Sequence, residues 1–191
     1  ETFSGLQNYI DGLSKTGFLS AFGWSIFITF FSTIVIVLFT AMTGWYITRS
    51  KTKVSTSLYF IFVFSMIVPF QMVMFTMSKV ANMLNLDNPV GLIVLYIGFG
   101  AGLSIFMFSG FVKSIPIDIE EAALIDGCNP IKTFFLIVLP LLKPICITVA
   151  ILNVMWIWND YLLPSLVIKS DYKTIPMAVQ YLRGGFGAID M

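Results

Sequence analysis

Charged residues are scarce in this sequence. Charged residues make up 11% of the 191 residues, and hydrophobic residues make up 58%. A soluble domain carries roughly 25% charged residues, and the mean hydropathy here is +0.91. A chain with so few charges cannot cover a surface that faces water. Composition therefore predicts an integral membrane protein.

Histidine is absent and only two cysteines are present. The absence of histidine excludes histidine acid–base catalysis and most catalytic zinc sites. Cys128 and Cys146 have no motif spacing, so we interpret them as apolar thiols without a disulfide. The net charge of +1, without a basic aromatic-rich patch, argues against nucleic acid as a partner. The sequence thus predicts no enzyme, no catalytic residue, no metal site and no cofactor.

Long uncharged runs are what the chain has instead. Residues 16–48 carry no charge, and a span needs about 20 apolar residues. The same reasoning predicts an all-α, polytopic helical membrane protein, with a transmembrane domain over residues 21–168. The predicted spans cover about 22–47, 55–80, 89–112 and 144–168. Pro69 lies in the middle of the second span and should kink it.

A glycine-rich stretch lies inside the third predicted span. It reads Gly98-Phe99-Gly100-Ala101-Gly102, and it lacks the Lys-Ser/Thr pair that a Walker phosphate loop needs. Gly98 and Gly102 stand four residues apart, a spacing that lets a second helix approach closely. We therefore predict helix packing here rather than nucleotide binding.

The basic residues predict the orientation in the membrane. If the spans alternate, most of them fall on one side, and the compact group at 49–53 marks that side as cytoplasmic. The loop 114–140 is then cytoplasmic as well. The polar segment 1–20, which lacks the features of a signal peptide, and the segment 169–191 are then external. The residues on the cytoplasmic side are Arg49, Lys51, Lys53, Lys113, Lys132 and Lys143.

One polar stretch interrupts the apolar pattern, at residues 118–127. Asp118 is placed to cap a helix, with Glu121 three residues on as a capping box requires. Gly127 can adopt the left-handed conformation that ends a helix. The predicted helix has about two turns, which is too short to be stable alone. Neighbouring segments or a partner must hold it.

This stretch carries a family motif. Glu121-Ala122-Ala123, Gly127 and Ile137-Val138-Leu139-Pro140 resemble the E-A-A-x3-G-x9-I-x-L-P loop of ABC importer permeases, at every fixed position. In that family the loop is cytoplasmic, and its coupling helix docks into a groove of the ATPase subunit. The alternative is an amphipathic helix that lies on the membrane surface. The resemblance implies these docking residues: Glu120, Glu121, Ala122, Ala123, Asp126 and Gly127.

Two further segments resemble the carbohydrate group of these permeases. They are Val68-Pro69-Phe70-Gln71 and Trp156-Ile157-Trp158-Asn159-Asp160-Tyr161-Leu162-Leu163-Pro164. The chain departs from the pattern at Trp24-Ser25, where the family often has Asn-Ser.

The spacing of the polar residues in the last span suggests a shared face. Asn153, Trp156, Asn159 and Asp160 stand three or four residues apart, as neighbours on one side of a helix do. Together with Gln71 they are the predicted translocation path, where a sugar could stack and form hydrogen bonds. The alternative is hydrogen bonding between helices plus an aromatic belt.

The resemblance implies a permease subunit that imports sugars or oligosaccharides across a bacterial or archaeal plasma membrane. Its expected partners are a second permease subunit, separate ATPase subunits, an extracytoplasmic solute-binding protein, the sugar and membrane lipid. The family usually has one more span at each end, so we expect a first and a last span to be missing here. Alternatives are a permease for another small polar solute, an ion-coupled secondary transporter or a membrane scaffold.

Overall fold

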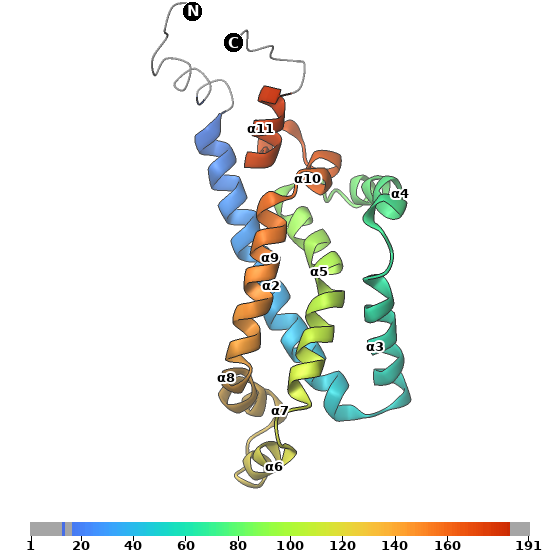
Figure 1. Ribbon diagram of the computed structural model, residues 1–191, viewed down its shortest axis with the longest axis vertical. Helices are drawn as coiled ribbons and strands as arrows, with labels where there is room; N and C mark the ends of the chain where they lie inside the picture. The colour runs from blue at the N-terminus through green and yellow to red at the C-terminus, as the bar shows by residue number, and fades with distance from the viewer. Residues whose placement is uncertain (1–12, 14–16, 184–191) are drawn as a thin grey trace, which may run out of the picture. The chain divides into compact units, whose positions relative to one another are not determined.

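The computed structural model describes residue 13 and residues 17–183. Every regular element in this part of the chain is a helix, which confirms the predicted all-α class (Figure 1). Most of the predicted external segment 1–20, and the end of 169–191, lie outside the described residues. The elements are α2 (Phe18–Ser50), α3 (Lys53–Ser65), α4 (Phe70–Met83), α5 (Pro89–Val112), α6 (Ile117–Ile125), α7 (Pro130–Thr133), the π-helix η1 (Phe134–Val138), α8 (Leu139–Leu141), α9 (Lys143–Asn159), α10 (Leu162–Val167), the 3-10 helix η2 (Ser170–Tyr172) and α11 (Ile175–Arg183).

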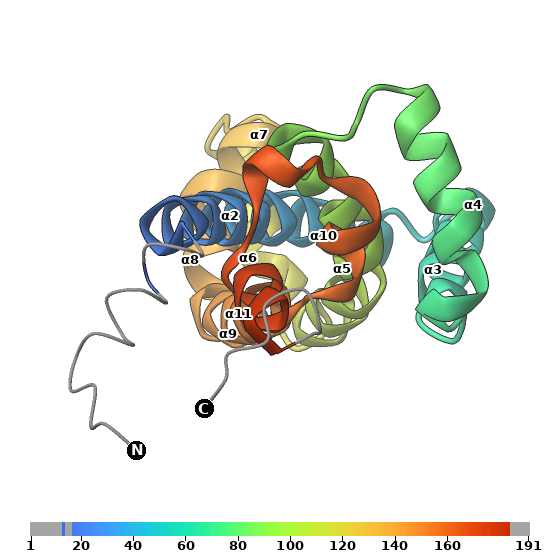
Figure 2. The same ribbon diagram turned by 90° about the horizontal axis from the view of Figure 1, so that it is seen from above.

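The chain divides into two compact units. Among the described residues, unit 1 comprises residue 13 and residues 17–31, 70–95 and 155–183, and unit 2 comprises 32–69 and 96–154. Helices α2, α5 and α9 contribute residues to both units. Figure 2 shows the same ribbon from above.

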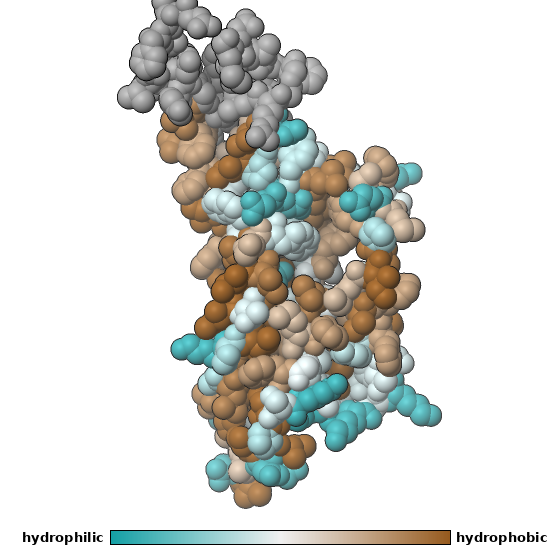
Figure 3. Space-filling model, viewed as in Figure 1, coloured by the Kyte–Doolittle hydropathy of each residue, from teal (hydrophilic) through white to brown (hydrophobic). Residues whose placement is uncertain are grey.

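Helices α2 and α5 are each long and apolar enough to cross a membrane. Two further spans result if the pair α3 and α4, and the pair Pro130–Leu141 and α9, are each counted as one broken span. Many large apolar side chains of these helices are exposed, as the brown areas of Figure 3 show. Such a surface suits lipid contact rather than water.

The second predicted span is interrupted rather than kinked. Helix α3 ends at Ser65 and α4 begins at Phe70, with Pro69 in the gap. Proline donates no backbone hydrogen bond and disfavours helical conformation at the preceding residue, so the helix cannot run through. The fourth predicted span is also interrupted, because α9 ends at Asn159.

In unit 1, polar contacts join α4 and the loop after it to α10 and the residues that follow α10. The hydroxyl of Ser78 donates to the carbonyl oxygen of Leu166 at 2.7 Å. The ammonium of Lys169 lies 2.7 Å from a carboxylate oxygen of Asp87. The hydrogen bond and the negative charge of Asp87 raise the pKa of Lys169.

The start of α2 forms a second set of contacts in unit 1. The amide of Ile175, the first residue of α11, donates to the hydroxyl of Ser25 at 2.8 Å. The rings of Trp24 and Tyr172 meet edge to face, with centroids 5.1 Å apart. The Trp24-Ser25 pair, where the sequence departs from the family pattern, thus positions the start of α11.

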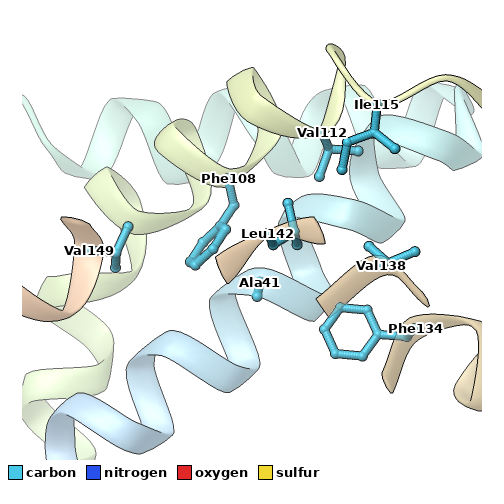
Figure 4. Packing of buried hydrophobic residues seen from close by; sticks show 8 residues of the cluster. All are labelled: Ala41, Phe108, Val112, Ile115, Phe134, Val138, Leu142 and Val149. Atoms are coloured by element: carbon cyan, nitrogen blue, oxygen red, sulfur yellow. The ribbon is translucent and has the colours of Figure 1, made fainter. Parts of the chain in front are cut away.

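The core of unit 2 joins the helices to the segment after α6. Ala41 comes from α2, Phe108 and Val112 from α5, Phe134 from η1 and Val149 from α9, and their side chains converge in Figure 4. Each of these five is 1% exposed or less. The segment that emerges from α6 is therefore fixed by packing on three helices. The remaining members of the cluster are Ile115, Val138 and Leu142.

A proline explains the irregular helix after α7. The ring of Pro140 would clash with a carbonyl one turn earlier, and it has no amide to donate. The π-helix η1 precedes it, and such a widened turn accommodates the missing bond. The axes of Pro130–Leu141 and α9 then differ by 78°.

Glycines allow close helix packing in unit 2, but not quite where predicted. A Cβ built on Gly102 would lie 2.7 Å from the hydroxyl of Ser65 and 2.8 Å from the carbonyl oxygen of Phe62 in α3. A Cβ on Gly100 would lie 2.8 Å from the side-chain oxygen of Asn153. Gly98 has open space instead. The packing role is therefore confirmed for Gly102, is wrong for Gly98, and extends to Gly100.

We expect Gly102→Ala to destabilise the protein, because its methyl group would meet backbone of α3 below contact distance. Overpacking of this kind costs about 1–3 kcal/mol. The matched change Gly98→Ala should be neutral or slightly stabilising, since alanine favours helix and the site is open. Thermal unfolding of the purified protein in detergent measures both. Equal midpoints for the two variants would contradict the close approach.

Candidate functional site

Helix α6 carries the Glu121-Ala122-Ala123 motif, and its start differs from the prediction. The helix begins at Ile117, and the residue before it is Pro116, which makes no side-chain capping bond. The predicted capping box is therefore wrong. Pro116 fixes φ near −57° and needs no hydrogen-bond partner for its nitrogen, so it starts the helix itself. Asp118 lies within the first turn, where its charge suits the positive end of the helix.

The end of α6 confirms the prediction for Gly127. This residue has φ of +82°, the left-handed region. Its amide donates to the carbonyl of Leu124 at 3.1 Å, and the amide of Cys128 donates to the carbonyl of Ala123 at 3.0 Å. These two bonds form a Schellman motif, which satisfies carbonyls that a helix end leaves free. Residue 127 thus sets where α6 stops and the chain turns toward α7.

Glu120 connects α6 to the last turns of α2. One carboxylate oxygen lies 2.7 Å from a terminal guanidinium nitrogen of Arg49 and accepts a bond from its Nε at 2.9 Å. The other oxygen accepts from the indole nitrogen of Trp45 at 2.8 Å. Glu120 is 6% exposed, so a charge-assisted network satisfies a buried carboxylate.

Arg49 also secures the approach to α6. Its guanidinium donates to the carbonyl of Ile115, two residues before the helix, at 2.9 Å. The expectation that neighbours hold this short helix is thus met within unit 2. The sequence marked Arg49 only as a topological signal, and it gave no sign that Arg49 or Trp45 is a partner of Glu120. Polar side chains gather at the end of unit 2 that carries α6 and the α2–α3 turn (Figure 3).

The outer surface of α6 presents the rest of the motif. Leu124 is 52% exposed and Ile125 is 85% exposed. Glu121 and Leu124 line a hollow of about 300 Å³ together with Pro130. Of the six residues predicted to dock, Glu120 and Ala123 are buried, and Glu121, Ala122, Asp126 and Gly127 are exposed.

Asn153, predicted on the translocation path, is buried in unit 2. Its amide nitrogen donates to the carbonyl of Val149 at 2.9 Å and to the hydroxyl of Ser104 in α5 at 3.3 Å. Its oxygen faces the space left by Gly100. This is the alternative reading, a hydrogen bond between helices, and it gives Asn153 a structural role in joining α9 to α5.

The other predicted path residues belong to unit 1. Gln71, Trp156 and Asn159 are exposed. The side chain of Asn159 donates to the carbonyl of Met155 at 2.7 Å. Asp160 lies beyond the end of α9, so it does not share the helical face that the spacing predicted.

Asp160 has a local structural role. Its carboxylate accepts from the amides of Leu162 and Leu163, at 3.0 and 3.4 Å. These are the first amides of α10, and the first amides of any helix have no carbonyl acceptor within the helix.

We expect Glu120→Gln to loosen α6, because Arg49 would lose its counter-charge in a buried place. Breaking such a pair costs on the order of 3 kcal/mol. Hydrogen–deuterium exchange of the amides of α6 should become roughly tenfold faster or more. The control is Glu121→Gln, the same change at the next, exposed residue, which should leave the exchange unchanged. Equal exchange in both variants would contradict the assigned role of Glu120.

Comparison with known proteins places these features in a family. Residues 36–184 match the family described as binding-protein-dependent transport system inner membrane component. The chain is 42% identical over 177 residues to a "probable starch degradation products transport system permease protein" of Thermoanaerobacterium thermosulfurigenes, covering 92% of this chain and 65% of that protein. It is 34% identical to a "multiple sugar-binding transport system permease protein" of Streptococcus mutans, covering 90% of this chain and 64% of that protein.

A third relative is a "melibiose/raffinose/stachyose import permease protein" of Bacillus subtilis, 31% identical, with 95% of this chain and 66% of that protein covered. The chain thus spans about two thirds of the length of these relatives. A crystal structure of a bacterial ABC transporter that imports the acidic polysaccharide alginate shares the fold, with a TM-score of 0.76 and 23% identity over 91% of this chain and 62% of that one. The chain belongs to the family of binding-protein-dependent transport system inner membrane components.

Proposed function

We propose that this chain is the transmembrane permease subunit of an ATP-driven ABC importer that moves sugars or oligosaccharides into the cell. The observation that carries the proposal is α6. It presents the Glu121-Ala122-Ala123 motif on a helix that is closed by Gly127 and joined to α2 through Glu120. The names of the three relatives, which refer to starch products or to sugars, support this substrate class.

In this proposal α6 is the coupling helix. Its exposed residues Glu121, Leu124 and Ile125 dock into a groove of a separate ATPase subunit, which supplies the hydrolysis of ATP. ATP closes the ATPase pair and displaces α6. Because Glu120 is bonded to Arg49 and Trp45, the displacement is transmitted to α2. The core formed by α2, α5, η1 and α9 transmits it further within unit 2.

The translocation path requires a second permease subunit. The exposed residues Gln71, Trp156 and Asn159 are its candidate lining residues in this chain, while Asn153 supports the helices. An extracytoplasmic solute-binding protein delivers the sugar. Residues 49–53 and 114–140 then lie on the cytoplasmic side of a bacterial or archaeal plasma membrane, and 1–20 and 169–191 lie outside.

The function is tested with the intact importer, purified with its ATPase subunits and reconstituted in liposomes. The sugar-loaded binding protein is supplied on the face of the membrane opposite the ATPase subunits. Sugar uptake should require ATP on the side of the ATPase and should continue when ionophores abolish ion gradients. Uptake that needs an ion gradient and no ATP would indicate a secondary transporter instead. Uptake of another polar solute but of no sugar would overturn the substrate class alone.

Docking by α6 is tested separately with Ile125→Asp. A charge placed in an apolar contact should cost 2 kcal/mol or more, as at an interface hot spot, which weakens association roughly thirtyfold. The ATPase subunits should no longer copurify, and ATP-driven uptake should be lost. The matched variant Ile125→Met keeps the apolar contact and should retain both. Normal copurification with Ile125→Asp would show that the ATPase docks elsewhere.

A further inference from the structure

A second hollow in unit 2, of about 490 Å³, lies apart from the exposed surface of α6. It is lined by the end of α2, the start of α3 and the end of α5. Lys51 stands in the turn between α2 and α3, with a left-handed φ of +44° that reverses the chain there. Lys113 follows the end of α5. The two lysines thus reach one hollow from two different connecting segments.

The charge in this hollow is positive and uncompensated. None of the described residues that line it carries a carboxylate. Arg49 also lines it, but its guanidinium is paired with Glu120. Within the described part of the chain, neither Lys51 nor Lys113 forms a salt bridge. The ammonium of Lys113 lies 5.9 Å from the ring centroid of Tyr59, a cation–π contact that keeps it at the hollow.

Hydroxyl groups and an apolar face complete the surroundings. Thr48, Thr56 and Ser109 line the hollow with hydroxyl groups. Each hydroxyl donates its hydrogen to a backbone carbonyl, so these side chains make the wall polar and leave the binding of an anion to the lysines. Phe60 lines it as well and is 63% exposed. Phe64, one turn further along α3, is 64% exposed. A positively charged, hydroxyl-rich end thus continues into an apolar helix face.

We propose that this hollow binds the phosphate headgroup of an anionic phospholipid, with Lys51 and Lys113 neutralising the phosphate and the acyl chains lying along the exposed face of α3. Basic pockets between spanning helices on the cytoplasmic side bind such headgroups. The combination of cations and an apolar wall selects a lipid over a soluble anion, which would use only the cations. The assignment of this lipid to the cytoplasmic leaflet rests on the topology given under the proposed function. The binding of an anionic lipid in this hollow does not depend on that topology.

The test uses the intact permease in nanodiscs of phosphatidylcholine that contain a small fraction of photoreactive phosphatidylglycerol. Illumination should label residues of α3 and the ends of α2 and α5. Each lysine near a membrane surface contributes about fivefold in affinity for anionic lipid, so Lys51→Gln with Lys113→Gln should reduce labelling roughly thirtyfold. The variant with arginine at both positions keeps the charges and should retain labelling.

The matched control is Lys53→Gln with Lys132→Gln, which removes the same charge from residues that do not line the hollow. This variant should be labelled as strongly as the unaltered protein. If it lost as much labelling as the Lys51 and Lys113 variant, the lipid would be responding to general surface charge and not to this hollow. Equal labelling by photoreactive phosphatidylcholine would overturn the selectivity for anionic lipid. Displacement of the label by inorganic phosphate at constant ionic strength would show a site for the free anion. Labelling confined to other helices would overturn the location.

Discussion

The buried carboxylate of Glu120 is the constraint on which the arrangement of unit 2 depends. A charge that is 6% exposed is tolerable only with partners, and Arg49 and Trp45 of α2 provide them. The nine-residue helix α6 would not be stable by itself. Glu120 therefore fixes both the existence and the place of α6, and makes its position depend on α2.

Two adjacent acids illustrate how the helix separates internal from external roles. Glu120 faces α2 and is used within the chain, whereas Glu121 is exposed beside Leu124 and Ile125. The coupling role that we propose for α6 requires both kinds of contact. One surface has to be firmly attached to its own chain, and the other has to remain available to a partner. Arg49 lines both hollows described above.

Packing among the apolar helices uses small residues and hydrogen bonds. This is expected in a membrane, because lipid is as apolar as the side chains and burying them against one another gives little hydrophobic driving force. Gly102 admits the backbone of α3, and Gly100 leaves room for Asn153, which bonds to Ser104. Prolines produce the irregularities: Pro69 lies where α3 and α4 separate, and Pro140 follows the π-helix η1. Apolar runs thus build the helices, while a few glycines, prolines and amides decide how they fit.

The sequence by itself determined the all-helical class, the apolar runs, the motif spacing and the left-handed end of α6 at Gly127. These features are local, because periodicity, composition and backbone preference act within a few residues. Only the tertiary structure decided that Glu120 pairs with Arg49 and Trp45, which are 71 and 75 residues away. It also decided that Gly100 rather than Gly98 meets a neighbour. Likewise, it decided that Asp160 accepts from the first amides of α10 instead of extending the face of α9. Such outcomes depend on which helices pack together and where each one ends, and a spacing pattern within a single helix carries neither kind of information.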